Sequence, residues 1–462
     1  MSQLKFTAFL TASPRLWRAV LCLMMALAPS LAEAQSGKLR LIRDAEIEQL
    51  IREYATPVLQ AAGVNAAGVE IYILNENSFN AFVIDGRRMF INTGAITQSK
   101  TPNEIIGVIA HETGHIAGGH NARLRSTLAN AKTAALVGML LGVGAVAAGA
   151  AAGDAGTGAA AGQAVISGSQ SAVMRTVLSY QRSEEAAADR AAVRYLNATG
   201  QSARGMIQTF QRFADQAIVT LRNVDPYVMS HPMARERVSA LQQLAQQSKY
   251  FDRKDPPALQ LRHDLARAKL YGFMERPGTV LRRYPPSDKS LPARYARAIT
   301  SYLNDDLRVA IRDIDGLIKE QPQYPYFWEL KGQALLEGGR GREAVAPLRK
   351  AVSLYPNSGL IRMILGQALL ASGNVDGAIS ELSKALEREP EASIGWRQLA
   401  MAYGQKGDIA RAEMASARSS FAAGDFKLAQ HHAARVQRKV PKGSPLWVQA
   451  DDILNYKPPK TN

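Results

Sequence analysis

His111, Glu112 and His115 lie in an HETGH segment, the pattern in this sequence that most directly suggests a reaction. Two histidines four residues apart on a helix are separated by about 40° around its axis, so both imidazoles can bind one metal ion. Glu112 lies about 100° from His111 around the helix, where it can reach a water on the metal. Zinc suits neutral imidazoles and lowers the pKa of its water toward about 7. The pattern therefore predicts that Glu112 activates a zinc-bound water for attack on a peptide carbonyl.

A third protein ligand is needed, and His120 is the nearest candidate by sequence. HETGHIAGGH approaches the HExxHxxGxxH pattern of metzincins, but the third histidine of that pattern would fall at Asn121. On a continuing helix His120 is also about 140° from His115. His120 is therefore interpreted as a polar residue at the helix end.

A later acidic segment, EEAAAD at 184–189, offers better ligands. Glu185 and Asp189 are four residues apart and share a helix face, so one can bind zinc while the other accepts a hydrogen bond from a ligand imidazole. Spacing alone leaves Glu184 as a rival to Glu185. The structural alternative is a solvated acidic helix face whose carboxylates pair with nearby arginines.

HExxH followed by a later E-x-x-A-D resembles the HtpX and CAAX-prenyl-protease class of gluzincin metallopeptidases. In that class the Glu of E-x-x-A-D is the third zinc ligand, so the resemblance implies that Glu185 binds zinc and that Asp189 supports a ligand. The resemblance extends over nearly the whole chain after residue 34, because exported members of this class carry C-terminal tetratricopeptide repeats.

The segment SHPMARER at 230–237 resembles the S/T-H-P-x-x-x-x-R segment of the same class. There the histidine lies near the zinc and can occupy its open position as a latch, while the arginine lies by the active site. The resemblance implies these roles for His231 and Arg237. Arg235 is close enough in sequence to substitute for Arg237.

The elements predicted around HETGH would hold it in place. Apolar residues recur at helical spacing over 44–62, and three β-type runs follow. An Asp85-Gly86 turn between the last two runs predicts a β-hairpin. Thr101 and Glu104 form a capping-box pattern at the start of the helix that continues into HETGH. The three predicted strands are 69–74, 81–84 and 88–91.

Residues 133–153 contain no charged side chain, and a tract rich in glycine and alanine continues to 168. The run is long enough to span a bilayer, and the spacing of Gly138 and Gly142 is typical of close helix packing. The glycine content and Asp154 favour a segment that touches a membrane. A true membrane span is the alternative.

Residues 1–34 are predicted to be a secretory signal peptide. Basic residues precede an apolar run that ends in Ala-Glu-Ala. Cleavage after Ala34 would remove three basic residues and one acidic residue, so the net charge of +16 would fall to +14. The one cysteine, Cys22, would also be removed. The mature protein would lie in the periplasm, and its metal ligands could only be His, Asp or Glu.

The chain beyond a predicted linker at 251–257 repeats every 34 residues, the period of tetratricopeptide repeats. Proline, alanine and glycine each recur at this spacing, and the repeats are predicted over 258–458. The predicted fold is α+β but mostly α, with a gluzincin-like domain and a small β-sheet at 35–250 followed by an α-solenoid. The proline series is Pro322, Pro356 and Pro390.

These features predict an exported zinc endopeptidase acting on unfolded or misassembled envelope proteins of the outer membrane, with the repeats binding clients. An edge strand of the hairpin could take up substrate backbone. The contrasting interpretation is a chaperone-like assembly factor with a mostly latched site, and a third is an integral membrane peptidase. The positive charge is attributed to contact with anionic lipid, acidic clients or outer-membrane assembly machinery rather than nucleic acid, because the sequence has no nucleic-acid-binding motif.

Overall fold

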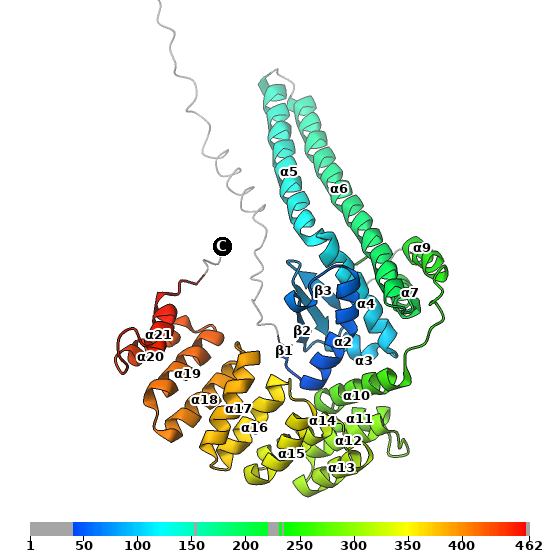
Figure 1. The fold of residues 1–462 in the computed structure, drawn as a ribbon. Coiled ribbons are helices and arrows are strands. Elements are labelled where there is room, and N and C mark those ends of the chain that lie inside the picture. Colours follow the sequence, from blue (N-terminus) through cyan, green and yellow to red (C-terminus); the bar gives the residue numbers. More distant parts are fainter. Residues whose placement is uncertain (1–39, 152–154, 220–230, 233–234, 459–462) are drawn as a thin grey trace, which may run out of the picture. The chain divides into compact units, whose positions relative to one another are not determined.

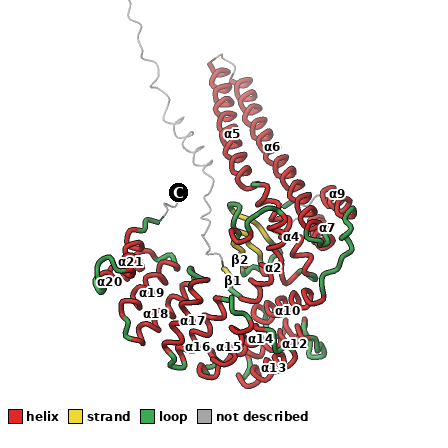
Figure 2. The backbone as a smooth tube through the Cα atoms, in the orientation of Figure 1, coloured by secondary structure: helices red, strands yellow, loops and turns green. Residues whose placement is uncertain are grey.

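The chain is mostly helical, with one small sheet near the start of its described part (Figures 1 and 2). This computed structural model describes residues 40–151, 155–219, 231–232 and 235–458. The predicted signal peptide at 1–34 lies outside these residues. The predicted fold class, mostly α with a small sheet followed by a helical repeat array, is confirmed.

The elements up to residue 246 share one apolar core, formed by side chains of α2, the sheet, α4, α6, α7 and α9. The core surrounds the HETGH helix, α4, so the predicted chemistry lies at the centre of this part of the chain. The elements are β1 (Leu41–Ile42), α2 (Ala45–Ala61), β2 (Glu70–Leu74), β3 (Ala81–Ile84), β4 (Arg88–Asn92), α3 (Thr93–Gln98), α4 (Pro102–Gly118), α5 (His120–Ala151), α6 (Ala155–Ala198), α7 (Arg204–Val219) and α9 (Arg235–Gln246).

The sheet has the strand order β1-β2-β4-β3, in which β2 and β4 are parallel and the outer pairs are antiparallel. Phe82 pairs with Phe90 across β3 and β4. Asp85 and Gly86 join these strands with φ angles of 55° and 76°, the left-handed values that a tight hairpin turn requires. The predicted hairpin is confirmed, and β3 lies at an edge of the sheet.

The start of α4 differs from its prediction. Thr101 is the N-cap residue, but its side chain makes no capping hydrogen bond. Glu104 instead accepts a hydrogen bond from the backbone amide of Lys100 at 3.1 Å and lies 3.3 Å from an Arg212 nitrogen. The predicted capping box is therefore wrong, because Lys100 and Arg212 engage the carboxylate that would have completed it. Pro102 begins the helix, a position that proline favours.

Helices α5 and α6 pack along each other as an antiparallel pair (Figure 1). Gly142 and Gly162 lie at their contact: a Cβ on Gly142 would be 2.8 Å from the carbonyl oxygen of Gly162. Gly138 is buried on the same side of α5 as Gly142, as the predicted close-packing motif requires. Among the described residues, His120–Val143 is the one helical stretch long and apolar enough to cross a membrane.

Antiparallel helix pairs follow from residue 257, with small residues where the helices of a pair cross. A Cβ on Gly332 would lie 2.3 Å from Leu348 Cγ, and a Cβ on Gly366 would lie 2.5 Å from Leu382 Cγ. The second contact repeats the first after 34 residues, which confirms the repeat. The helices are α10 (Pro257–Met274), α11 (Pro277–Arg283), α12 (Leu291–Asn304), α13 (Leu307–Glu320), α14 (Pro325–Glu337), α15 (Gly341–Leu354), α16 (Gly359–Ala371), α17 (Val375–Arg388), α18 (Ser393–Lys406), α19 (Ile409–Ala422), α20 (Phe426–Gln437) and α21 (Pro445–Asn455).

Buried polar groups join α2 to the repeats. Glu46 accepts hydrogen bonds from the hydroxyls of Tyr295 at 2.9 Å and Tyr324 at 2.6 Å. Lys269 Nζ lies 2.7 Å from Asp44 Oδ2 and 3.4 Å from Glu46 Oε2. Removing one of these residues would leave the other buried charges unpaired and would destabilise the junction between α2 and the repeats.

Acid should weaken this junction at His263, which lies 3.1 Å from the Tyr54 hydroxyl and 3.2 Å from the Ser99 carbonyl. Burial lowers the pKa of His263 to about 4, below the ordinary value of about 6.5. Between these values the unfolded chain binds a proton that the folded chain does not. The free energy of unfolding should therefore fall as pH decreases from about 6.5, by roughly 2 kcal/mol at about pH 5.

Urea unfolding of the wild type and His263→Gln at neutral pH and at about pH 5 measures this contribution. Glutamine can hydrogen-bond but does not titrate, so the variant should lose less stability on acidification than the wild type. Equal losses in the two proteins would contradict the assignment to His263.

Candidate metal centre

Helix α4 directs His111, Glu112 and His115 into the protein interior. Their exposed fractions are 0%, 1% and 7%. The helix packs against β3, α6 and α7, which bury these side chains. Burying two imidazoles and a carboxylate together is costly unless they are paired or bind a metal.

Helix α6 brings Glu185 and Asp189 against α4. Gly114, which precedes His115, permits this approach, since a Cβ there would lie 2.9 Å from both the Cα and the carbonyl oxygen of Ala188. Any side chain at position 114 would push the two helices apart. The glycine of HETGH therefore helps to bring the two halves of the site together.

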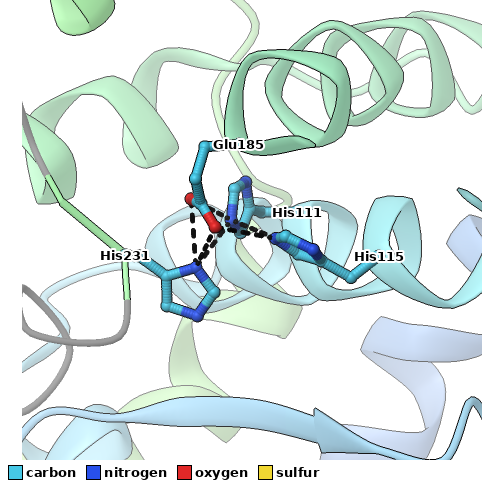
Figure 3. Close-up of side chains that lie close together, drawn as sticks. All are labelled: His111, His115, Glu185 and His231. Atoms are coloured by element: carbon cyan, nitrogen blue, oxygen red, sulfur yellow. Dashed lines mark hydrogen bonds and ion pairs between the residues drawn. The ribbon is translucent and has the colours of Figure 1, made fainter. Parts of the chain in front are cut away.

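His111, His115, Glu185 and His231 direct one ligand atom each toward a common point (Figure 3), and these atoms all lie within 4.8 Å of one another. His111 Nε2 lies 3.1 Å from His115 Nε2 and 3.3 Å from His231 Nδ1. The Glu185 carboxylate lies 3.3 Å from both His111 Nε2 and His115 Nε2. It lies 3.0 Å from His231 Nδ1.

These separations suit a zinc ion. Tetrahedral zinc with ligands at about 2.0–2.1 Å places its ligand atoms about 3.3 Å apart. The separations between ligand atoms given above range from 3.0 to 3.3 Å. Three imidazoles and one carboxylate are also a donor set that zinc accepts. The residues present therefore fit the metal.

The electrostatics of the group favour a cation at its centre. Burial lowers the pKa of His115 and of His231, which keeps these rings neutral. Burial alone would raise the pKa of Glu185, but His231, His111 and His115 hold it well below its usual range. Burial alone would lower the pKa of His111, but Asp189 and Glu185 raise it to about 9. Without a metal, the carboxylates therefore draw a proton onto His111.

Asp189 and Arg237 hold the ligands in position. Asp189 Oδ1 lies 2.9 Å from His111 Nδ1, which favours the ring orientation in which Nε2 faces the metal position. Arg237 donates to the two oxygens of Asp189 at 2.6 and 2.8 Å, and its third nitrogen lies 2.8 Å from Glu185. Arg235 is exposed. Arg237 is thus the arginine that reaches the site.

His120 has a place that its sequence interpretation missed. Helix α4 ends at Gly119, whose φ of 64° turns the chain back, so His120 is not on a continuing helix. Its Nδ1 lies 2.9 Å from His115 Nδ1, and its Nε2 lies 2.7 Å from Glu184 Oε2. Burial lowers the pKa of His120 to about 4, so the ring is neutral. Gly118-Gly119 was the sequence signal that a helix end lay before His120.

A tautomer assignment follows from these partners. His120 donates its Nε2 proton to Glu184, so its Nδ1 carries a lone pair. His115 Nδ1–H then donates a hydrogen bond to His120 Nδ1. His115 Nε2 then carries the lone pair that faces His111 and Glu185. Glu184 therefore supports a ligand through His120, while Glu185 faces the metal position itself.

Glu112 lines a cavity of about 210 Å³ beside the ligand group, together with Phe82 and Val83 of β3. Neither carboxylate oxygen of Glu112 accepts a hydrogen bond from the described residues. One of them lies 3.5 Å from His231 Nε2. Burial raises the pKa of Glu112 to about 7. The carboxylate is therefore placed to exchange a proton with a molecule in the cavity.

The sequence matches known proteins in two separate regions. Residues 41–245 match the model of peptidase family M48, and residues 295–359 and 335–405 match tetratricopeptide repeat models. The β-barrel assembly-enhancing protease of Yersinia pestis is 23% identical over 79% of this chain and 74% of its own. That of Escherichia coli K12 is 22% identical over 70% of this chain and 64% of its own.

Among solved structures, MamA is 20% identical over 34% of this chain and 90% of its own, with a TM-score of 0.29. The family match agrees with the resemblance to gluzincin metallopeptidases predicted from HExxH and E-x-x-A-D. All four residues that converge on the metal position lie inside the region that matches family M48. The chain thus resembles peptidase family M48 over residues 41–245, and the regions that match tetratricopeptide repeat models follow this part in the same chain.

Proposed function

We propose that the chain is an exported, zinc-dependent endopeptidase of the periplasm that hydrolyses peptide bonds in unfolded or misassembled outer-membrane proteins. The buried group of His111, His115 and Glu185, with Glu112 beside it, is the observation that carries this proposal. The names of the relatives support a role in outer-membrane assembly. The repeats recruit clients, and the outer-membrane assembly machinery is the expected partner.

A zinc ion held by His111, His115 and Glu185 would polarise the scissile carbonyl and make a water acidic enough to attack it. Glu112 accepts the proton of the attacking water, since its pKa of about 7 lets it take up and release a proton near neutral pH. It then delivers that proton to the leaving amine. Asp189 and Arg237 contribute by holding His111 and Glu185 in position.

The edge strand β3 is the proposed support for the substrate backbone. Phe82 and Val83 line the same cavity as Glu112, so a peptide running along β3 would pass the carboxylate. Backbone pairing selects for extended, unfolded chains and tolerates many side chains. Asn121 Nδ2 donates to the Val83 carbonyl at 2.6 Å, and a substrate strand would take over this acceptor.

A single substrate in two states tests the proposal. An outer-membrane β-barrel protein should be cleaved when denatured and resist cleavage when folded in detergent. A chelator should abolish cleavage, and added zinc should restore it. Cleavage that continues in protein shown to be free of metal would refute the zinc mechanism, and equal cleavage of the folded barrel would refute the selectivity for unfolded chains.

His231 favours a second candidate function, an assembly factor whose protease site is mostly latched. Its Nδ1 lies 3.3 Å from His111 Nε2 and 3.0 Å from Glu185. It thus occupies the position that a catalytic zinc keeps open for water or substrate. With His231 in place the site would bind metal but not substrate, and the repeats would act on clients without cleavage.

Replacing His231 by alanine should raise the rate of cleavage of a denatured substrate about tenfold, because it removes the competitor for the open position. Zinc content should change little, since three ligands are kept. His432→Ala is the matched control, because His432 lies on the repeats and pairs with Glu413 at 2.8 Å. A His231→Ala protein that cleaves more slowly than the control would show that His231 assists the reaction.

A further inference from the structure

Helices α5 and α6 carry a long segment without charged side chains. Lys132 and Arg175 bound this segment, and Asp154 is the one charged residue between them in the sequence. We call the helical residues 133–151 and 155–174 the outer hairpin. At 1.5 Å per residue each helix of the outer hairpin is about 30 Å long. Such a length of exposed, uncharged helix is unusual for a surface in contact with water.

The outer hairpin has glycines at its helix contact and large apolar side chains exposed on its surface. Glycines lie at the contact between the helices, where Gly142 packs against Ile166 and Gly162 packs against Val146. The large apolar side chains of α5 point outward, with Leu140 and Leu141 exposed by 72% and 63%. In a helix pair exposed to water, polar side chains would cover the outside. Small residues inside and large apolar residues outside are typical of helices that pack within lipid.

The two helices differ in polarity. The free face of α5 carries exposed apolar side chains: Leu136, Val137, Met139, Leu140, Leu141 and Val143. Helix α6 instead carries Gln163, Ser167 and Ser171 on one exposed stripe at four-residue spacing, and Gln163 donates to Ser167 at 3.3 Å. A hairpin with one apolar helix and one partly polar helix suits the boundary between lipid tails and headgroups.

Exposed basic side chains lie just before the outer hairpin on α5 and just after it on α6. They are Arg125, Lys132, Arg175 and Arg182. The sequence between Arg125 and Arg182 contains a single acidic residue, Asp154. This positive charge complements the headgroups of anionic lipids. The apolar helix and the basic residues thus point to the same partner.

We propose that the outer hairpin binds to the surface of a lipid bilayer, with the free face of α5 among the lipid tails and the Gln163–Ser167–Ser171 stripe of α6 toward water. Lys132 and Arg175 contact anionic headgroups. The hairpin holds the metalloprotease domain at the membrane, because α5 begins five residues after His115 and α6 carries Glu185. This proposal requires no assumption about the substrate of the protease.

Sedimentation with vesicles tests the proposal on the full chain. The wild type should bind phosphatidylcholine vesicles and bind more tightly when phosphatidylglycerol is added. Leu140→Glu with Leu141→Glu should lower the partition into vesicles about a hundredfold. The control is Met401→Glu with Leu428→Glu, which alters two exposed apolar residues of the repeats (54% and 44% exposed) and should bind as the wild type does. Unchanged thermal unfolding would show that both double variants are folded.

A fluorescent label distinguishes the proposed orientation from a membrane span. Because the chain after residue 34 contains no cysteine, Leu140→Cys and Ser167→Cys can each be labelled specifically in the exported protein. Vesicles should shift the emission of an environment-sensitive label to the blue at position 140 and leave it nearly unchanged at 167. Equal shifts would overturn the orientation in favour of a spanning hairpin.

Two further results would overturn the proposal itself. One is a wild type that stays in the supernatant with both vesicle compositions. The other is a Leu140→Glu, Leu141→Glu variant that binds vesicles like the control. If that variant instead changes the sedimentation coefficient of the lipid-free protein, the face of α5 is a contact between copies of this chain.

Discussion

Replacing Glu112 by glutamine should lower kcat/KM for cleavage of a denatured protein by about a thousandfold. The amide keeps the size of the carboxylate but cannot accept a proton from water, and loss of a general base costs about 10²–10⁴ in rate. Glu112 is not one of the group of metal-ligating residues, whose atoms converge on a different point. Zinc content should therefore stay close to that of the wild type.

The comparison needs metal analysis beside the rate, because only a slow variant with its full zinc content isolates the proton transfer. Glu343→Gln is a suitable control, since Glu343 is an exposed residue of the repeats that pairs with Arg340. If Glu112→Gln cleaves as fast as this control, then Glu112 is not the general base. If it is slow and lacks zinc, its effect is on metal binding.

Replacing Glu185 by alanine should weaken zinc binding by at least about a hundredfold, more than the 10- to 100-fold typical for residues that only support a ligand. Three imidazoles would remain, but the carboxylate that lies 3.3 Å from both His111 and His115 would be lost. Competition with a chromophoric chelator at one pH measures the affinity directly. When zinc is limiting, the rate of cleavage should fall as the zinc affinity falls.

Glu184→Ala is the matched control because it makes the same change one residue away. Glu184 contacts His120 at 2.7 Å and reaches His115 only through that ring. Its loss should weaken zinc binding by no more than about tenfold. A larger loss for Glu184→Ala than for Glu185→Ala would mean that the wrong carboxylate has been assigned to the metal.

The pair of adjacent glutamates shows how far the sequence alone could predict the site. His111, Glu112 and His115 follow from helical spacing, because all three lie on one helix whose geometry is local. Glu185 required a family resemblance, because the choice between it and Glu184 depends on how α6 is rotated about its axis against α4. Packing sets that rotation, including the contact of Gly114 with Ala188, and no local pattern encodes it.

Where the chain reverses direction, spacing arguments failed. His120 was predicted to lie at the helix end, but spacing did not predict that Gly119 ends α4 and turns His120 back onto His115. The capping box failed for a related reason, since a distant residue, Arg212, engages Glu104. The hairpin at 81–92 and the 34-residue repeat were predicted well, because turn chemistry and repeat period are local properties.

The continuity of α6 has a thermodynamic consequence. One uninterrupted helix, Ala155–Ala198, carries both the polar stripe of the outer hairpin and Glu185, which faces the proposed metal position. A rotation of the outer hairpin about the α6 axis would therefore also turn the carboxylate. By linkage, any factor by which lipid changes the affinity for zinc is also the factor by which zinc changes the affinity for lipid. Measuring vesicle binding with and without the metal thus reports on the active site without any substrate.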